Sequence, residues 1–472
     1  MTVPFRVRAG GALLAVALAA TAGCATYVAS SLEVRDDLRA GRWDSALEAV
    51  DAGRKGADRL LRLLLRGHVL HYAGRFEESN AVFQEAEDLS AELYTRSVSQ
   101  AALSLIVNDT TVDYRGQPFE LAMVPYYRAF NYLSLGDVES AQVEARKAVL
   151  RLARSVEVTL AELEGSEELS RVAPLADNGF LHWFSGLLFE ADGAVNDAFV
   201  AYRNALSAYR AERDLTGVPP PGALARDLER VGRALGFTDE LEALREEVPD
   251  LFREAVPGPV PRGEVVLLVE TGWIAHRDQV MVHVPILDTD RRAGSPEALA
   301  GVLVNRAGPG WRASSTVSID YWLTAAVPEL APPEPGVVRG VRLSAAGRSE
   351  DGYRVDDLSR RAQLFHKATL PRVLFKTFLR ALAKYAVTRA AEKEDPAAGL
   401  LVNLLGVVTE RADTRCWSTL PDGLRMARLP LPPGRHDLRI EYLDERGAVL
   451  TEETTEVTLR PDGWVFLNRR PL

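Results

Sequence analysis

Few side chains in this sequence have the chemistry and spacing of a catalytic centre. Cys416 follows Arg415, whose positive charge would lower the pKa of the thiol and favour a nucleophilic thiolate. Asp413 and His436 are the acid–base partners that such a cysteine could use. Unpaired cysteines are more often small, buried core residues, so we expect no catalytic residue and retain an enzyme site here as an alternative.

Known catalytic and metal-binding motifs add no further candidates. The sequence has no Gly-x-Ser-x-Gly elbow, no Walker-type phosphate loop, no His-Glu-x-x-His and no paired-cysteine zinc spacing. His68 and His71 lie three residues apart on a predicted helix and could offer two imidazoles to a metal ion. No third ligand stands near them in the sequence, so we predict neither a metal nor a cofactor.

The best-defined chemistry belongs to Cys24. Two arginines precede an apolar run over residues 12–20 and then three small residues, which is the layout of a cleaved secretory signal. Small residues directly before a cysteine resemble the lipobox of bacterial lipoproteins. This resemblance implies that residues 1–23 are a signal peptide that is removed, and that Cys24 is lipidated and tethers the chain to a membrane.

The residue after Cys24 indicates which membrane. It is alanine, whereas an aspartate at this position retains many lipoproteins of Gram-negative bacteria in the inner membrane. The same resemblance therefore implies an outer-membrane anchor, with the protein facing the periplasm.

Length, charge and cysteine content limit the classes of protein to which the chain can belong. The chain has 472 residues, and single hydrophobic cores stop growing at about 250–300 residues, so we expect at least two domains. The net charge of -10 argues against nucleic acid or anionic lipid as a main partner. Cys24 and Cys416 are the only cysteines, so the fold should not depend on disulfide bonds.

One short pattern recurs four times in the first half. A glycine is followed at +2 by an apolar residue, at +3 by Asp, Glu or Asn, and at +5 by Ala or Ser; the glycines are Gly41, Gly74, Gly136 and Gly193. A glycine of this kind supplies the left-handed residue that ends one helix before the next begins. With small and aromatic residues at matching offsets, the pattern resembles an interrupted tetratricopeptide repeat. Repeats of this kind most often bind peptides or proteins.

The repeats are separated by inserts at 87–122 and 149–178. The first insert ends in the loop that holds Tyr114, Arg115 and Gly116, shortly before Glu120. Loops held on rigid scaffolds often carry function, so these four residues are candidates for partner binding. The alternative is that the neighbouring Pro118 and Phe119 only fasten two helices together.

The second half changes to alternating apolar and polar runs after a Pro-rich linker at 256–262. We predict a sandwich-like β domain over 263–472, with strands at 263–271, 278–286, 315–323, 337–344, 422–429, 435–443, 447–459 and 463–468. Two helices interrupt it, near 357–392 and 396–410. Apolar runs of about 10–14 residues are usually core helices, so we expect these helices to cover a sheet. The alternative is that residues 368–408 lie on, or insert into, a membrane or a partner helix.

Three stretches, at 113–149, 180–206 and 412–421, resemble a family of bacterial lipoproteins of unassigned function. Its members carry N-terminal tetratricopeptide-like repeats and a C-terminal β-rich domain. The third stretch holds Asp413, Arg415 and Trp417, which would form either a structural corner or a docking surface. Cys416 stands where a small hydroxyl residue is expected from the resemblance, which weakens a catalytic role there. The resemblance suggests cell-envelope assembly as the setting.

Together these patterns predict an α+β protein with a tetratricopeptide-like helical domain over 24–255 and a β-rich domain over 263–472. We expect a membrane-anchored, non-enzymatic scaffold or adaptor that binds unidentified envelope proteins. One alternative is a cell-wall-modifying enzyme with its site at Asp413, Cys416 and His436. The other is a pore or secretion accessory component that uses residues 368–408.

Overall fold

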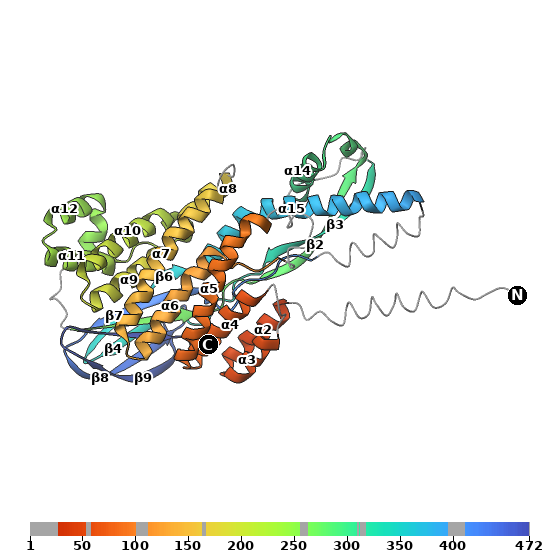
Figure 1. The fold of residues 1–472 in the computed structure, drawn as a ribbon. Coiled ribbons are helices and arrows are strands. Elements are labelled where there is room, and N and C mark those ends of the chain that lie inside the picture. The colour runs from red at the N-terminus through yellow and green to blue at the C-terminus, as the bar shows by residue number, and fades with distance from the viewer. Residues whose placement is uncertain are drawn as a thin grey trace.

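A computed structural model describes residues 27–52, 58–100, 112–162, 167–254, 263–308, 311, 318–394 and 411–471 (Figure 1). Helices come first in the chain and strands later, so the mixed α+β class predicted from the sequence is confirmed. Cys24 with its signal segment, the linker at 256–262 and the predicted helix at 396–410 lie outside the described residues.

The helical half is a row of antiparallel helix pairs. The elements are α2 (Tyr27–Arg39), α3 (Trp43–Ala52), α4 (Arg59–Tyr72), α5 (Phe76–Gln100), α6 (Pro118–Ser134), α7 (Val138–Glu162), α8 (Glu167–Val172), η3 (Ala173–Ala176), α9 (Gly179–Ala191), α10 (Val195–Thr216), α11 (Gly222–Leu235), α12 (Thr238–Glu247) and α13 (Pro249–Glu254).

The predicted turn glycines end the first helix of each pair. Gly41, Gly74, Gly136 and Gly193 all have a positive φ, between 67° and 79°. After Gly74, for example, the Arg75 N–H donates to the Leu70 carbonyl, which is the hydrogen bond that closes a helix in this way. Gly236 makes a similar turn that the repeated pattern misses, because Thr238 replaces the apolar residue at +2 and Leu241 replaces the small residue at +5.

Small residues set how closely paired helices approach. A Cβ placed on Gly67 would lie 2.8 Å from the ring of Phe83, and one placed on Gly186 would lie 2.4 Å from the ring of Tyr202. Both aromatic rings are buried. The glycine on one helix therefore makes room for the aromatic ring on the next.

The strands form two four-stranded sheets and one hairpin. They are β1 (Gly263–Thr271), β2 (Arg277–Leu287), β3 (Ile319–Leu330), β4 (Gly340–Ala345), β5 (Arg348–Asp351), β6 (Tyr353–Asp357), β7 (Gly423–Pro430), β8 (Gly434–Leu443), β9 (Val449–Leu459) and β10 (Gly463–Arg469). The inner sheet has the order β10-β1-β7-β6 and the outer sheet β5-β4-β8-β9, while β2 pairs with β3. Within the inner sheet, β10 runs parallel to β1.

Several predicted strand boundaries need correction. The strand expected at 315–323 spans Ile319–Leu330, and β5 and β6 were not predicted. These two strands are four and five residues long and follow a tight turn in which Ala346 has φ 49°, so they show little alternation. Helix α14 (Pro296–Ala307) was also missed, although Ser295 caps its first turn and Pro296 begins it.

The inner sheet lies between the helices and the outer sheet. Along β1, Val266 and Leu268 belong to the core shared with the helices, whereas Val265, Leu267 and Val269 belong to the core shared with the outer sheet. Alternate side chains of a strand point to opposite faces, so both faces of this sheet are buried. The helical half and the strand half therefore share one hydrophobic core.

An arm projects from this three-layered body (Figure 1). We define the arm as β2, β3, α14 and the distal part, 374–389, of helix α15 (Leu358–Glu394). Its own core includes Val284, Leu323, Leu303, Phe378 and Leu382. The long helix predicted at 357–392 is thus present, and its distal part covers the β2–β3 hairpin. Within the described residues, no helix is both long enough and apolar enough to cross a membrane.

Candidate functional site

The two segments that hold the predicted partner-binding residues contact each other. Tyr114, Arg115, Gly116 and Glu120 lie just before and at the start of α6. Asp413, Arg415 and Trp417 lie in an irregular segment before β7. We call residues 411–422 the docking segment, because it lies against the helical half as described below.

Glu120 is the centre of this contact. Its carboxylate accepts the Gln117 N–H at 2.8 Å, the Tyr114 hydroxyl and, from the docking segment, the Trp417 N–H at 2.8 Å. Glu120 is 1% exposed, and burial raises the pKa of its carboxyl group. Position three of helix α6 is the position at which a glutamate closes the first helical turn, so one side chain both caps the helix and binds the docking segment.

Arg415 reaches from the docking segment into the helical half. Its guanidinium donates to both carboxylate oxygens of Asp413, to Asp58 at 3.0 Å and to the Val112 carbonyl at 2.9 Å. It also lies over the Tyr114 ring, 5.6 Å from the ring centre. The ion pairs satisfy a guanidinium that is almost completely buried.

Trp417 is the apolar anchor of the docking segment and is fully buried. Its indole packs against His68, Phe83 and Tyr127, with ring centres 5.3 to 5.9 Å apart. The indole N–H donates to Thr419 Oγ1, which also lies 2.8 Å from His68 Nδ1.

Two arginines bind the backbone carbonyl groups of the two residues that follow Trp417. Arg35 of α2 donates to the Ser418 carbonyl at 2.8 Å, and Arg470 donates to the Thr419 carbonyl at 2.7 Å. The docking segment is therefore held through its backbone as well as its side chains, in the way a protein holds a bound peptide.

The structure brings the predicted residues together but leaves little of them exposed. Tyr114, Glu120, Arg415 and Trp417 are buried, and their polar groups bind within the chain. Gly116 and Asp413 are partly exposed, and Arg115 is exposed. The buried candidates therefore make their contacts within the chain, and Arg115 is the candidate that a partner could reach directly.

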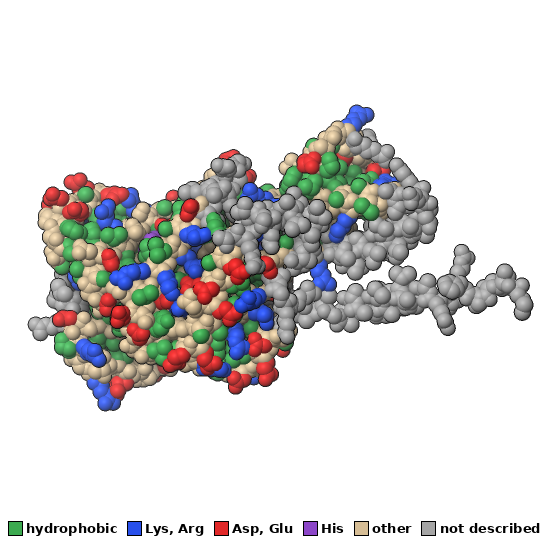
Figure 2. Space-filling view, in the orientation of Figure 1, with side chains coloured by type: hydrophobic (Ala, Val, Ile, Leu, Met, Phe, Trp, Pro, Cys, Tyr) green, Lys and Arg blue, Asp and Glu red, His purple; other side chains and the backbone are tan. Residues whose placement is uncertain are grey.

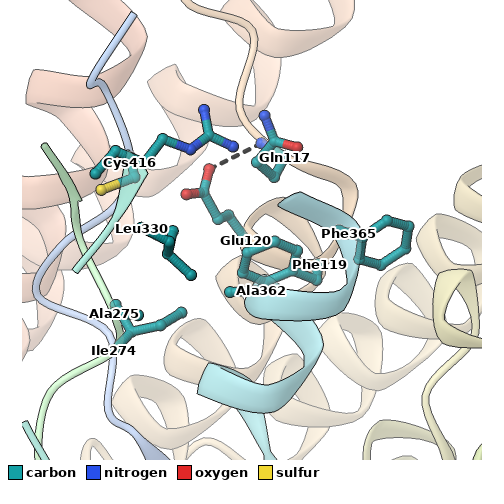
Figure 3. Close-up of a pocket in the computed structure, with 10 residues that line it drawn as sticks. Gln117, Phe119, Glu120, Ile274, Ala275, Leu330, Ala362, Phe365 and Cys416 are labelled. Carbon is teal, nitrogen blue, oxygen red and sulfur yellow. Dashed lines mark hydrogen bonds between the residues drawn. The ribbon is translucent and has the colours of Figure 1, made fainter. Parts of the chain in front are cut away.

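Cys416 lines a small pocket at the same junction (Figure 3). Phe119, Glu120, Ile274, Ala362 and Phe365 are among the other lining residues. Burial raises the pKa of the Cys416 thiol to about 11, so the group is a neutral thiol near pH 7. Arg415, which was expected to lower this pKa, directs its guanidinium to Asp413 and Asp58 instead.

The remaining predicted partners of Cys416 are elsewhere. His436 lies partly exposed on β8 of the outer sheet, where its Nε2 is 2.8 Å from the Pro432 carbonyl. It does not line the Cys416 pocket. The arrangement of Asp413, Cys416 and His436 that an enzyme would need is thus absent from the part of the chain that the structure describes.

His68 and His71 are core residues of α4. His68 contacts Thr419 and Tyr72, and His71 Nδ1 lies 2.7 Å from the Asn131 side-chain oxygen. Burial lowers the pKa of both imidazoles, which keeps them neutral. Within the described ranges, no group of three or more potential ligands could hold a metal ion.

A set of charged residues on the helix-facing side of the inner sheet is not among the predicted site residues. Glu270 of β1 is fully buried and accepts hydrogen bonds from Tyr72, Tyr126 and Tyr127 of the helices and from Asn468 of β10. The signal was present in the sequence, because glutamates at 264 and 270 are the only charges in an otherwise apolar strand.

A second buried group joins β7 to α11. Arg428 donates to Asp227 at 2.5 and 3.0 Å and to Glu264 at 2.7 and 2.8 Å. Asp227 also accepts the Trp183 indole N–H and an N–H of Arg230. Burial alone would raise the pKa of Asp227, but Arg428 and Arg230 hold it below its usual value.

A third group joins α15 to the helices. Arg361 donates to Glu212 at 2.7 Å, to Asp356 at 3.2 Å and to the carbonyls of Leu175 and Asp177. Burial raises the pKa of Glu212 to about 7. Through Glu270, Arg428 and Arg361, buried polar groups of the strand half thus bind matching groups of the helical half, which helps to fix how the two halves fit.

Comparisons with known proteins add little to this description. No protein-family model matches the chain, and no curated protein matches it. One solved structure with a weak likeness is the crystal structure of BtubC (BKLC) from P. vanneervenii. It is 20% identical, with a TM-score of 0.28, and the match covers 50% of this chain and 80% of that one.

Proposed function

We propose that this protein is a lipid-anchored, non-enzymatic adaptor on the periplasmic side of the outer membrane that binds other proteins of the cell envelope. In this proposal Cys24 carries the lipid. The helical half is a tetratricopeptide-like solenoid, which the repeated glycine turns and the glycine–aromatic contacts support. The strand half is a β-sandwich, which the core between the inner and outer sheets supports.

The observation that carries the adaptor proposal is that the reactive side chains lie inside the junction and bind groups of the same chain. Glu120, Arg415, Cys416 and His68 lie inside the junction, and their charges or hydrogen bonds are matched by groups of the same chain. A body of this kind presents its outer surface to partners. It suits a scaffold better than a catalyst, which needs its reactive groups within reach of a substrate.

The outer helices offer apolar side chains for such contacts. Val143 and Leu150 lie seven residues apart on α7 and are 44% and 70% exposed, and Val200 of α10 is 58% exposed. The Arg146–Asp197 ion pair joins these two helices. Figure 2 shows acidic and basic side chains interspersed with apolar ones over the helical face. A partner would therefore bind here through a mixed apolar and charged surface.

In-cell photocrosslinking tests the adaptor function. A photoreactive residue is placed at Leu150 or Val200, and at Leu450 of β9 as a matched exposed control on the outer sheet. We expect the same envelope protein to be captured from both helical positions and not from Leu450. When the probe is at Val200, the substitution Leu150→Asp should weaken the capture. Capture that is equal at all three positions, or absent from the helices, would contradict the proposal.

The two alternative functions gain less support. The raised pKa of Cys416, and the position of His436 outside the Cys416 pocket, do not favour a cell-wall-modifying enzyme. For a pore component, the described part of residues 368–408 has its apolar side packed on the β2–β3 hairpin. We therefore propose neither.

A further inference from the structure

Helix α15 has an unusual charge distribution. Between Leu358 and Ala391 it contains eight Arg and Lys residues and no Asp or Glu, in a chain whose net charge is -10. From Arg372 to Lys384, the basic residues of the helix are spaced by four and are Arg372, Lys376, Arg380 and Lys384. Residues at this spacing lie along one side of a helix.

The basic side of the distal helix points away from the arm. Phe378, Ala381 and Leu382 pack on the hairpin and on α14, so they mark the inner side. The opposite side of the helix holds residues spaced by four, seven and four, namely Arg372, Lys376, Ala383 and Val387. Arg372 and Ala383 are exposed, and Val387 is 60% exposed. We call these four residues the outer face of α15.

The outer face has positive charge available for a partner. Arg361 and Arg389 are used within the chain, by Glu212 and Asp320 respectively. By contrast, no described carboxylate lies within ion-pair distance of Arg372 or Lys376. An exposed apolar residue beside basic ones is the composition of helices that lie on a membrane surface.

The arm also lies close to the proposed anchor. Its base is fastened to α2: Arg35 donates to the Ile274 carbonyl, just before β2, and pairs with Glu334, just after β3. Arg39 also pairs with Glu334. In Figure 1 the arm projects from the body toward the same side as α2.

The distance from the anchor to this base is short. Helix α2 begins at Tyr27, three residues after Cys24. Three residues extend by at most about 10 Å, and the helix from Tyr27 to Arg35 is about 12 Å long. A lipid on Cys24 therefore holds the base of the arm within roughly 20 Å of the bilayer, and the distal helix alone is about 24 Å long.

We propose that the outer face of α15 binds the anionic phospholipid surface of the membrane in which the Cys24 lipid is anchored. The guanidinium and ammonium groups bind lipid phosphates, and Val387 enters the headgroup region. The inference rests on the proposed lipid anchor, because that anchor is what brings the arm to the membrane. Binding by the arm would fix the orientation of the body, so that the outer helices face partners in the periplasm.

Vesicle co-sedimentation tests this binding without help from the lipid. The mature polypeptide carrying Cys24→Ser is mixed with vesicles of phosphatidylethanolamine and phosphatidylglycerol, or of phosphatidylcholine alone. We expect partition onto the anionic vesicles only, weakening as salt is added. A basic residue near an anionic membrane contributes about fivefold to binding, so Arg372→Gln with Lys376→Gln should lower the partition by roughly 25-fold. The matched control is Arg203→Gln with Arg226→Gln, exposed residues of α10 and α11, which should change it little.

Equal binding to neutral and anionic vesicles would overturn the inference. So would no vesicle binding at low salt, which would leave an acidic protein surface as the partner of this helix. The comparison of lipids and the salt dependence use the unsubstituted helix, so they stand even if the double variant does not fold. Failure of the lipid anchor is recognised separately, by an unmodified thiol on Cys24 in cells.

Discussion

The buried Arg428 provides the sharpest test of how the helical half and the strand half are joined. It lies on β7 with a side chain that is 5% exposed and binds Asp227 of α11 and Glu264 of β1, which are 0% and 9% exposed. In Arg428→Leu, Glu264 loses its partner, and Asp227 keeps only Arg230 and the Trp183 indole. Removing one member of a buried ion pair costs about 3–5 kcal/mol, because the remaining charge is left without compensation.

The control is an exposed ion pair of similar geometry. Arg342 of β4 pairs with Asp351 of β5, with side chains that are 38% and 66% exposed. Exposed pairs contribute about 0–1 kcal/mol, so Arg342→Leu should have a small effect. A third variant, Arg428→Leu with Asp227→Leu and Glu264→Leu, removes all three charges together. It should regain much of the lost stability, because no buried charge is left unpaired.

Urea unfolding followed by two signals is the assay. Far-ultraviolet circular dichroism reports mainly the helices, and intrinsic tryptophan fluorescence, to which Trp464 on β10 beside Arg428 contributes, reports the packing at the inner sheet. Since the two halves share one core, both signals should shift together to lower urea in Arg428→Leu. A loss below about 1 kcal/mol, or a shift in the fluorescence signal alone, would refute a buried ionic junction.

Three further predictions concern single positions. In a Cys24→Ser variant, Cys416 carries the one remaining thiol. Because this thiol is buried and its pKa is about 11, it should react with a thiol reagent far more slowly in the folded protein than in urea. Rapid reaction of the folded protein would contradict this. Burial lowers the pKa of His366 from 6.5 to about 4, so protonation favours the unfolded chain between these values. Stability should be complete above pH 6.5 and fall as the pH is lowered toward 4, and His366→Gln should make the urea midpoint less dependent on pH in this window. Gly186→Ala places a Cβ 2.4 Å from the Tyr202 ring, and the overpacking should lower the free energy of unfolding by about 1–3 kcal/mol. Gly222→Ala is the control, because open space surrounds this position, and it should be neutral or slightly stabilising. Equal melting temperatures for the two variants would count against the helix pairing.

Local patterns predicted much of the secondary structure. The turn glycines of the helical half could be found because each such turn needs a residue that tolerates a positive φ, as at Gly74. The main strands followed from alternation. Strands β5 and β6 are too short to alternate visibly, and α14 was overlooked although its capping residue Ser295 is present.

The joining of the two halves could not be predicted in the same way. Glu120 and Trp417 lie 297 residues apart in the sequence, and nothing local to either residue indicates the other. Both are predicted as candidates, Glu120 because loops held on rigid scaffolds often carry function and Trp417 as part of a structural corner or a docking surface. In the structure they bind each other, a contact that depends on packing over the whole inner sheet. The unusual glutamates of β1 were the one local sign that this sheet meets polar groups of the helices.

The most direct test of the proposed function is mass spectrometry of the N-terminal peptide from cells, with fractionation of the membranes. The proposal predicts that the mature chain begins at Cys24, carries a diacylglyceryl thioether and an amide-linked acyl chain, and sediments with the outer membrane. Cys24→Ser should remove the modification and release the protein from that fraction. A mature chain that begins at another residue, or an unmodified Cys24 thiol in membrane-bound protein, would contradict the lipid anchor on which the adaptor proposal depends.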